Sequence, residues 1–174
     1  MKMTVISYSL TGNNDRLARS LAGALGAEHA SITEPKRRTM GTIVFDNVLG
    51  RTPKVAPPAL KPEEQDLVMF VSPVWMGQVA SPLRACFKEF GPRLGKYAFV
   101  SICGGADGPN PKLAAELTKR LGKEPSAIVE LHKADFLPRE PKPTRNDTMK
   151  YRVSEEQVKQ LTEQAMSALK KVTG

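Results

Sequence analysis

Hydroxyl and amide side chains cluster around a glycine near the start of the chain, in the segment Ser9-Leu10-Thr11-Gly12-Asn13-Asn14. Short side-chain donors and free backbone N–H groups at the start of a helix are what a phosphate group needs. The segment lacks the glycine and lysine pattern that binds nucleoside triphosphates and the three-glycine pattern that binds dinucleotides. It therefore predicts a site for one phosphate group. The alternative is a polar turn in which an asparagine caps a helix.

Two further segments carry residues suited to a planar ligand. Trp75 is the one tryptophan of the chain, and it lies in the proline- and glycine-containing segment 72–82. An aromatic ring displayed in a loop can stack on a planar ligand, although a half-buried packing role is the alternative. The segment 104–108 holds three glycines, which let the backbone approach a ligand closely. Each signal is weak by itself.

Short apolar runs predict the strands that position these segments, at residues 3–8, 67–72, 97–103 and 127–131, with a weaker strand at 28–32. The runs at 67–72 and 97–103 are almost continuously apolar. Continuous apolarity is typical of strands buried on both faces, as in a parallel sheet covered by helices.

Helical patterns fall between these runs. Leucines recur every four residues in 13–25, and similar spacing marks 81–90, 111–121 and 154–172. Ser154 and Gln157 form a capping box at the start of the last helix. Alternating strands and helices predict right-handed crossovers and one three-layer α/β domain over residues 1–174. Residues 34–62 and 138–151 break this rhythm and are predicted to be long surface loops or lids.

Ligands of open α/β sheets bind beyond the carboxyl ends of the strands, where all three segments are expected to lie. Together these segments resemble the flavodoxin-like FMN-binding family. Residues 8–14 are similar to the family's phosphate loop, Ser/Thr-x-Thr-Gly-x-Thr/Asn, residues 72–77 to its second flavin loop, and residues 100–108 to its third. The resemblance covers nearly the whole chain in order and spacing. It implies a flavodoxin-like sandwich around a five-stranded parallel sheet with strand order 2-1-3-4-5.

The resemblance also implies a role for each segment. The FMN phosphate would be held by Ser9, Thr11, Gly12, Asn13 and Asn14. The isoalloxazine ring would be lined by Pro73, Val74, Trp75, Met76 and Gly77. Its other side would be flanked by Gly104, Gly105 and Asp107. The flavin would carry the electrons while the protein supplies position and electrostatics, and no metal is expected.

Two departures from the family's electron carriers favour an enzyme. Those carriers usually place a second aromatic residue in the third loop and tend to be acidic, whereas segment 104–108 has no aromatic residue and the chain carries a net charge of +8. An uncovered ring face lets a hydride donor and an acceptor take turns. The sequence thus predicts an FMN-dependent oxidoreductase that reduces quinone-like acceptors with a nicotinamide dinucleotide. The alternatives are a flavodoxin-type electron-transfer protein with a redox protein partner, and a scaffold that has lost its flavin.

The basic residues are scattered and are dense only at 36–38 and 139–152. Neither stretch is interleaved with aromatic residues, so no nucleic-acid partner is expected. A solvated surface and the attraction of an anionic redox partner both remain open. No apolar run reaches the about 18 residues of a membrane span, and Cys86 and Cys103 lack metal-ligand spacing. We therefore expect a cytoplasmic protein, with a homo-oligomer as one way to complete the open flavin face.

Overall fold

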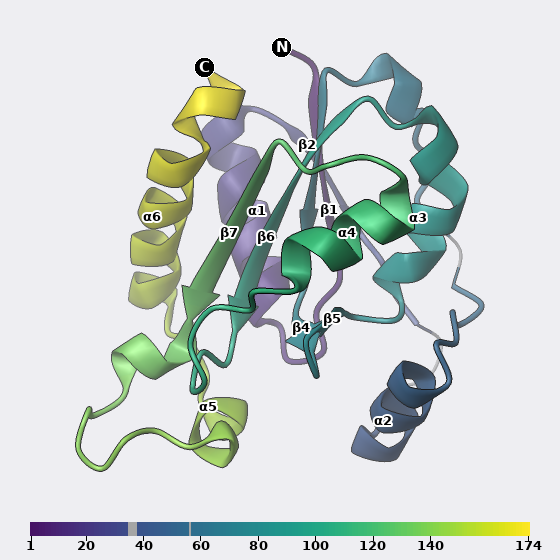
Figure 1. The fold of residues 1–174 in the computed structure, drawn as a ribbon. Helices are drawn as coiled ribbons and strands as arrows, with labels where there is room; N and C mark the ends of the chain where they lie inside the picture. The colour runs from purple at the N-terminus through teal and green to yellow at the C-terminus, as the bar shows by residue number, and fades with distance from the viewer. Residues whose placement is uncertain (35–37, 56) are drawn as a thin grey trace.

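The chain forms a parallel sheet covered by helices on both faces (Figure 1). The computed structural model describes residues 1–34, 38–55 and 57–174, so Lys36 and Arg37 of the predicted basic cluster lie outside the described residues. The strands of the main sheet are β1 (Met3–Ser7), β2 (Glu28–Ser31), β3 (Leu67–Val71), β6 (Lys96–Cys103) and β7 (Ala127–His132). Their order, β2-β1-β3-β6-β7, confirms the predicted order 2-1-3-4-5, because β6 and β7 are the fourth and fifth strands of this sheet.

The central strand β3 explains the continuous apolar runs. All five of its residues are buried: Leu67, Met69 and Val71 face one core, while Val68 and Phe70 face the other. The first core is covered by α1 (Asn13–Leu25) and α6 (Glu155–Thr173), and the second by α3 (Leu83–Phe90) and α4 (Leu113–Leu121). Two covered faces leave the central strands no polar side, which confirms the three-layer arrangement.

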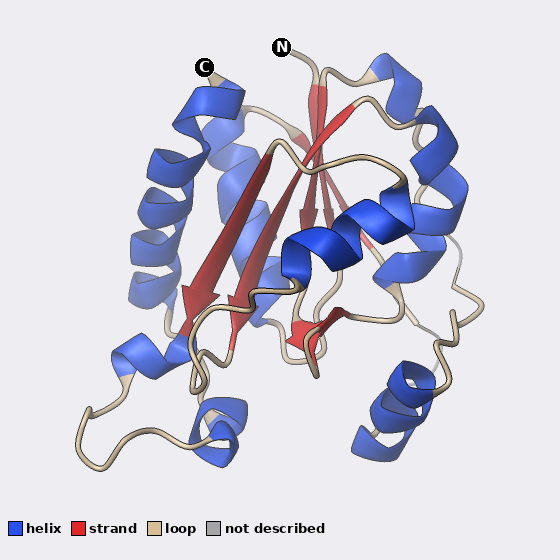
Figure 2. Ribbon diagram, in the orientation of Figure 1, coloured by secondary structure: helices blue, strands red, loops and turns tan. Residues whose placement is uncertain are grey.

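The structure corrects the prediction in three segments (Figure 2). Segment 34–62 contains helix α2 (Met40–Val48) and ends where a 3₁₀ turn (Pro62–Glu64) begins, and segment 138–151 contains helix α5 (Arg145–Lys150). Capping boxes begin both helices, at Thr39 and at Thr144. The segment after β3 contains a small hairpin of β4 (Val74–Trp75) and β5 (Gln78–Val79). Further 3₁₀ turns occupy Gly91–Arg93 and Lys133–Phe136.

Candidate functional site

A cavity of about 1000 Å³ lies beyond the carboxyl ends of the sheet strands. The predicted site residues that line it are Thr11, Asn13, Asn14, Pro73, Val74, Trp75, Met76, Gly77, Gly104, Gly105 and Asp107. Ser9 and Gly12 are the two predicted residues outside its lining. We call residues 8–15, 73–77 and 104–108 the strand-end loops. The fold brings these three loops together around one cavity, and their roles in binding a cofactor stay predictions.

The first strand-end loop presents unpaired backbone N–H groups at the start of α1. Gly12 is the N-cap of that helix and has a φ of 88°, a left-handed conformation that favours glycine. The first helical hydrogen bond runs from Arg16 N–H to Gly12 O at 3.0 Å. The N–H groups of residues 13–15 are therefore without helical acceptors, and the helix dipole favours an anion beside them. This arrangement fits a phosphate group.

The side chains of Asn13 and Asn14 are already engaged within the protein. The Asn14 amide donates to Ile102 O at 3.0 Å and accepts from Ile102 N–H at 2.8 Å, which fastens α1 to the end of β6. Asn13 Oδ1 accepts from the Arg16 guanidinium at 3.0 Å. Asn14 therefore offers a ligand its backbone N–H rather than its side-chain amide, whereas Asn13 Nδ2 makes no hydrogen bond within the described residues and stays available to a ligand in the cavity.

The two hydroxyls of the loop are differently placed. Thr11 is exposed and lines the cavity. Ser9 Oγ is buried and has no hydrogen-bond partner within the described part of the chain. A buried hydroxyl without a partner is costly, so a group that accepts from Ser9 would stabilise the loop.

A polar cluster fixes the loop from beneath. Asp15 accepts hydrogen bonds from Ser31 Oγ at 2.6 Å, Arg19 Nε at 2.9 Å and Ser7 Oγ at 3.2 Å. Burial alone raises the pKa of Asp15, but these hydrogen bonds outweigh it and hold the pKa below its ordinary value. His29 Nε2 lies 2.9 Å from Ser7 Oγ. Burial lowers the pKa of His29, although the nearby Asp15 carboxylate opposes this shift. The cluster is built around an ionised Asp15 and a neutral His29.

The second strand-end loop is the hairpin turn between β4 and β5. Its central residues, Met76 and Gly77, have φ values of 51° and 78°. Two positive φ values make a type I′ turn, whose twist matches that of the flanking strands. Glycine adopts this conformation freely, whereas it costs a residue such as Met76 about 1–2 kcal/mol. The Met76 side chain is 65% exposed. The turn thus holds a flexible apolar side chain at the rim of the cavity.

Trp75 lines the cavity and is also packed against the protein. Its ring meets the Tyr8 ring edge-on, with centroids 5.7 Å apart and planes at 87°. The amide of Asn47, in α2, donates to Trp75 O at 3.0 Å. The amide of Asn110 donates to Gly77 O at 2.9 Å, which ties the hairpin to the segment after β6. The contact with Tyr8 orients the Trp75 ring. Its stacking on a ligand stays a prediction.

The third strand-end loop passes so close to β7 that it requires glycine. Gly105 has a φ of 76°, and a Cβ on it would lie 2.4 Å from His132 Cβ. A Cβ on Gly104 would lie 3.0 Å from Thr148 Oγ1 in α5. Asp107 pairs with Arg145 of α5 at 2.7 Å, but both side chains are exposed, so the pair contributes little stability. Sterics rather than charge therefore set the path of this loop.

Four titratable side chains stand together where β6 and β7 end. Ligand atoms of Cys103, Glu130 and His132 lie within 4.8 Å of one another. Burial raises the pKa of the Cys103 thiol to about 12 and lowers the pKa of Lys133. Cys103 is therefore a protonated thiol at neutral pH, and Lys133 places a cation in the cavity wall.

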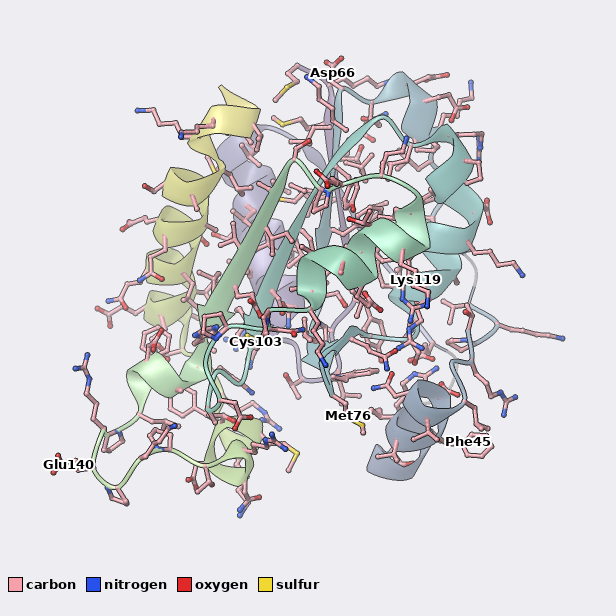
Figure 3. All side chains as sticks on the ribbon, in the orientation of Figure 1. Phe45, Asp66, Met76, Cys103, Lys119 and Glu140 are labelled. Carbon is pink, nitrogen blue, oxygen red and sulfur yellow. The ribbon has the colours of Figure 1, made fainter. Side chains whose placement is uncertain are left out.

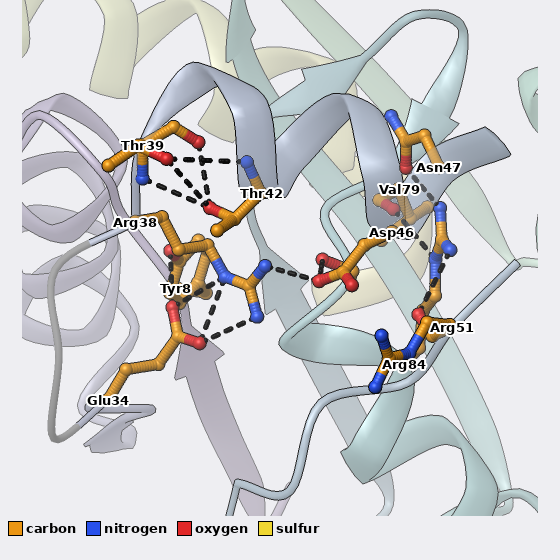
Figure 4. A network of polar contacts seen from close by, with 11 residues as sticks. Tyr8, Glu34, Arg38, Thr39, Thr42, Asp46, Asn47, Arg51, Val79 and Arg84 are labelled. Atoms are coloured by element: carbon orange, nitrogen blue, oxygen red, sulfur yellow. Dashed lines mark hydrogen bonds and ion pairs between the residues drawn. The ribbon is translucent and has the colours of Figure 1, made fainter. Parts of the chain in front are cut away.

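Helix α2 is fastened beside the cavity by a buried arginine (Figure 4). Arg84 is 2% exposed. Its guanidinium donates to Asn47 Oδ1 of α2 at 2.6 Å, to Gln78 Oε1 at 3.0 Å and to Val79 O at 3.2 Å. Burial lowers the pKa of Arg84, yet the group keeps its charge because arginine is protonated far above neutral pH. A charge buried this deeply persists only when its donors are satisfied, and here they hold α2 to the hairpin.

An ion-pair network joins the segment before α2 to Tyr8, the residue that follows β1. Arg38 pairs with Glu34 at 2.8 Å and with Asp46 of α2. The Tyr8 hydroxyl donates to Glu34 Oε2 at 2.8 Å. Burial, reinforced by the Glu34 carboxylate, raises the pKa of Tyr8, so this hydroxyl stays protonated. The network places α2 relative to Tyr8, whose ring packs edge-on against the cavity-lining Trp75.

Sequence reasoning missed the parts of the cavity wall that come from α2 and α5. These are Ile43, Val44, Arg145, Asn146, Thr148 and Met149. Two signals were present, namely the apolar run Ile43-Val44-Phe45 and the spacing of Thr144 and Asp147, which form a capping box. The position of α2 depends on hydrogen bonds to residues far away in the sequence, which no local pattern predicts.

No protein-family model matches the chain, and no curated protein matches its sequence. Solved structures do. A flavoprotein from Lactobacillus acidophilus NCFM in complex with FMN aligns with 74% of this chain and 92% of its own, at 18% identity and a TM-score of 0.64. A protein from Bacteroides uniformis ATCC 8492 aligns over 93% and 97%, at 16% identity and a TM-score of 0.65.

A flavodoxin from the domain Archaea aligns over the full length of both chains, at 13% identity and a TM-score of 0.53. The fold is flavodoxin-like. A flavodoxin-like sheet puts its ligand edge where this chain has its strand-end loops and its cavity. None of the described helices is long and apolar enough to cross a membrane.

Proposed function

We propose that this flavodoxin-like chain binds FMN in the cavity and uses it as an oxidoreductase. The observation that carries the proposal is the start of α1, where unpaired backbone N–H groups beside Gly12 adjoin an apolar-walled cavity about 1000 Å³ in volume. A monophosphate fits the first feature and a planar ring the second. The Lactobacillus acidophilus flavoprotein of the same fold was crystallised with FMN, which supports this choice of ligand.

The phosphate would be held chiefly by the backbone of the first strand-end loop. The available donors are the N–H groups of residues 13–15, the hydroxyls of Ser9 and Thr11, and Asn13 Nδ2, whereas the Asn14 amide holds the loop in shape. Gly12 supplies the left-handed residue that lets the N–H groups converge. Donors fixed in advance need no reorganisation when an anion arrives, which favours tight binding.

The ring would lie between the second and third strand-end loops. Pro73, Val74, Trp75 and Met76 form one wall, and Gly104, Gly105 and Asp107 the other. Bound FMN supplies one-electron transfer and hydride transfer. Trp75 is held edge-on to Tyr8 and so gives the ring an oriented wall, while the Lys133 ammonium can stabilise negative charge in the cavity.

The substrates proposed are a nicotinamide dinucleotide as hydride donor and a quinone-like molecule as acceptor. Segment 104–108 brings glycines and no aromatic ring to the cavity, which leaves a ring face accessible. Ile43, Val44 and Met149 add apolar surface on both sides, as a planar hydrophobic acceptor requires. The second candidate function is electron transfer without substrate turnover. In that case a redox protein would dock over the accessible ring face and exchange electrons with the flavin.

The test uses the purified full-length chain, freed of flavin and then titrated with FMN. Under anaerobic conditions NADPH should bleach the yellow complex, and a soluble quinone should restore its colour. A complex that NADPH and NADH leave yellow, but that a redox protein reduces, would favour the electron carrier instead. A chain that ignores FMN would overturn the proposal.

A further inference from the structure

Exposed apolar side chains gather at one end of the molecule. Among the described residues, the exposed large apolar side chains are Met1 (61%), Val44 (42%), Phe45 (51%), Val48 (71%), Leu49 (57%), Met76 (65%) and Met149 (49%). All but Met1 belong to α2 and its C-cap, to the turn of the hairpin, or to α5. Isolated exposed apolar residues are ordinary, whereas a group of this size at one end marks an interaction surface.

This end is the one onto which the cavity opens. Helices α2 and α5 both lie beyond the carboxyl ends of the strands, while the two termini lie at the opposite end (Figure 1). Val44 of α2 and Met149 of α5 line the cavity, so the two helices flank its entrance. Phe45 and Met76 point out at this same end (Figure 3). We call α2 and α5 the flanking helices, and the surface they share with the hairpin turn the entrance face.

Positive charge surrounds the same face. Residues 138–152 include Arg139, Lys142, Arg145, Lys150 and Arg152, all exposed, against the two acidic residues Glu140 and Asp147. Arg51 and Lys54 follow α2 and are also exposed. Arg51 lies over the Phe45 ring, 5.3 Å from its centroid. The apolar side chains of the entrance face are thus bordered by cations on both sides of the cavity.

We propose that the entrance face docks on an anionic lipid bilayer. Apolar side chains that protrude from short helices can enter the boundary between headgroups and acyl chains, while flanking lysines and arginines pair with lipid phosphates. A second copy of the chain suits this face poorly, because a symmetric contact would oppose one basic stretch to another on chains that each carry a charge of +8. An acidic protein would match the charge, but it would also need an apolar patch of its own to cover the protruding side chains, which a bilayer supplies everywhere on its surface.

Docking of this kind would bring the cavity entrance to the membrane surface. On the basis of the proposed function, the electron acceptor would be a quinone dissolved in the bilayer, which would enter between the flanking helices without crossing water. The docking itself does not depend on FMN. A failure of vesicle binding would therefore remove this inference and leave FMN binding untouched.

The experiment measures co-sedimentation of the full chain, with and without FMN, on two kinds of vesicle. One contains phosphatidylcholine alone, and the other contains phosphatidylcholine and phosphatidylglycerol in equal parts. The charge variant is Lys142→Gln/Lys150→Gln, and its matched control is Lys170→Gln/Lys171→Gln, which removes the same charge from the end of α6 at the opposite end of the molecule. The apolar variant is Val48→Ser/Leu49→Ser. Far-UV circular dichroism establishes that all of them fold.

The wild type should bind the anionic vesicles, and salt should weaken that binding. Each lysine near an anionic surface contributes about fivefold in affinity, so the charge variant, which removes two, should lose about 25-fold while its control stays within about twofold. The apolar variant should also bind more weakly. Equal binding to both vesicles, equal losses in the charge variant and its control, or no binding at all would overturn the proposal. So would a stable dimer that Val48→Ser/Leu49→Ser dissociates, or capture of an acidic redox protein by a chain that vesicles do not bind.

Discussion

The strand-end loops and the flanking helices line the same cavity, but different forces hold them. The loops follow sheet strands directly. Gly12 and Gly105 adopt positive φ, and the Asn14 side chain ties the first loop to β6 by two hydrogen bonds to the Ile102 backbone. Helix α2 is held by hydrogen bonds from buried side chains, above all by the bond from Arg84 to Asn47. One part of the cavity wall, the strand-end loops, is therefore positioned by the sheet. Another part, α2, is positioned by a few hydrogen bonds between residues far apart in the sequence.

The difference teaches where the cavity can change. A loop set by sterics keeps its shape as long as its glycines remain, and it suits a cofactor whose position must not vary. A helix held by a handful of polar bonds can open locally at a lower free energy than the sheet. We therefore expect the phosphate and ring positions to be rigid and the entrance between the flanking helices to be adjustable.

The largest expected effect comes from removing the bond that fastens α2. Arg84→Met removes the buried donor to Asn47 Oδ1 and Val79 O, whereas Gln78 Oε1 keeps its hydrogen bond from Arg120 Nη2 at 3.2 Å. Unpaired buried acceptors and lost packing together should lower the free energy of unfolding by about 4 kcal/mol. Urea titration measures this loss, and hydrogen exchange should quicken most in α2.

Arg51→Met is the control for that change, since Arg51 is exposed and lies over Phe45 on the outer side of α2. It should cost less than about 1 kcal/mol. If the two variants lost the same stability, or if exchange in α2 were unchanged in Arg84→Met, α2 would not depend on the buried arginine.

The next effect probes the loops. Gly105→Ala places a Cβ 2.4 Å from His132 Cβ at a φ of 76°, so strain and overpacking should cost about 3 kcal/mol. Gly108→Ala is the matched control, because Gly108 has a φ of 84° but no atom within 4 Å of its Cβ position. It should cost about 1 kcal/mol, the strain alone. Equal losses in denaturant titration would show that close approach to β7 does not shape this loop.

A smaller effect, of opposite sign, lies in the hairpin turn. Met76→Gly relieves the strain of a φ of 51° but adds conformational freedom to the unfolded chain. The net result should be a gain of about 0.5 kcal/mol, measured by thermal unfolding. Met76→Leu, which keeps the strain, should show no gain. A loss of stability in Met76→Gly would mean that the exposed side chain contributes more than its turn costs.

The smallest effect is a pH dependence beneath the first strand-end loop. Because burial holds the pKa of His29 below its ordinary value of 6.5, the unfolded chain binds this proton first as the pH falls. The contribution of neutral His29 to the free energy of unfolding is therefore complete above pH 6.5. It is lost as the pH falls from 6.5 through the lowered pKa of His29 in the folded state. His29→Gln should flatten the fall in unfolding free energy over that range. An unchanged slope would place the titration elsewhere.

The sequence allowed the fold and the strand-end loops to be predicted because both depend on local patterns. The continuous apolar run of β3 predicted a sheet covered on both faces. The polar turn around Gly12 predicted the start of a helix at the carboxyl edge of that sheet. The engagement of Asn14 with Ile102 could not be read locally, because the two residues are 88 positions apart in the chain.

The flanking helices show the complementary limit. Thr39 and Thr144 do carry capping boxes, but α2 and α5 are short and rich in poor helix formers, so packing decides whether they form. For α2 the decisive contact is Arg84 to Asn47, across 37 positions. The sequence around Arg84 in α3 does not show that this arginine is buried, nor that it contacts another helix.

The central claim about the proposed FMN site is that the phosphate group binds at the start of α1. The most direct test is the ratio of affinities for FMN and riboflavin, which differ by the phosphate, in the wild type, Thr11→Gln and Thr11→Glu. The wild type should prefer FMN about a hundredfold or more, Thr11→Gln should keep most of that preference, and Thr11→Glu should abolish it, because a carboxylate beside a dianion costs several kcal/mol. Equal ratios in all three proteins would contradict the account.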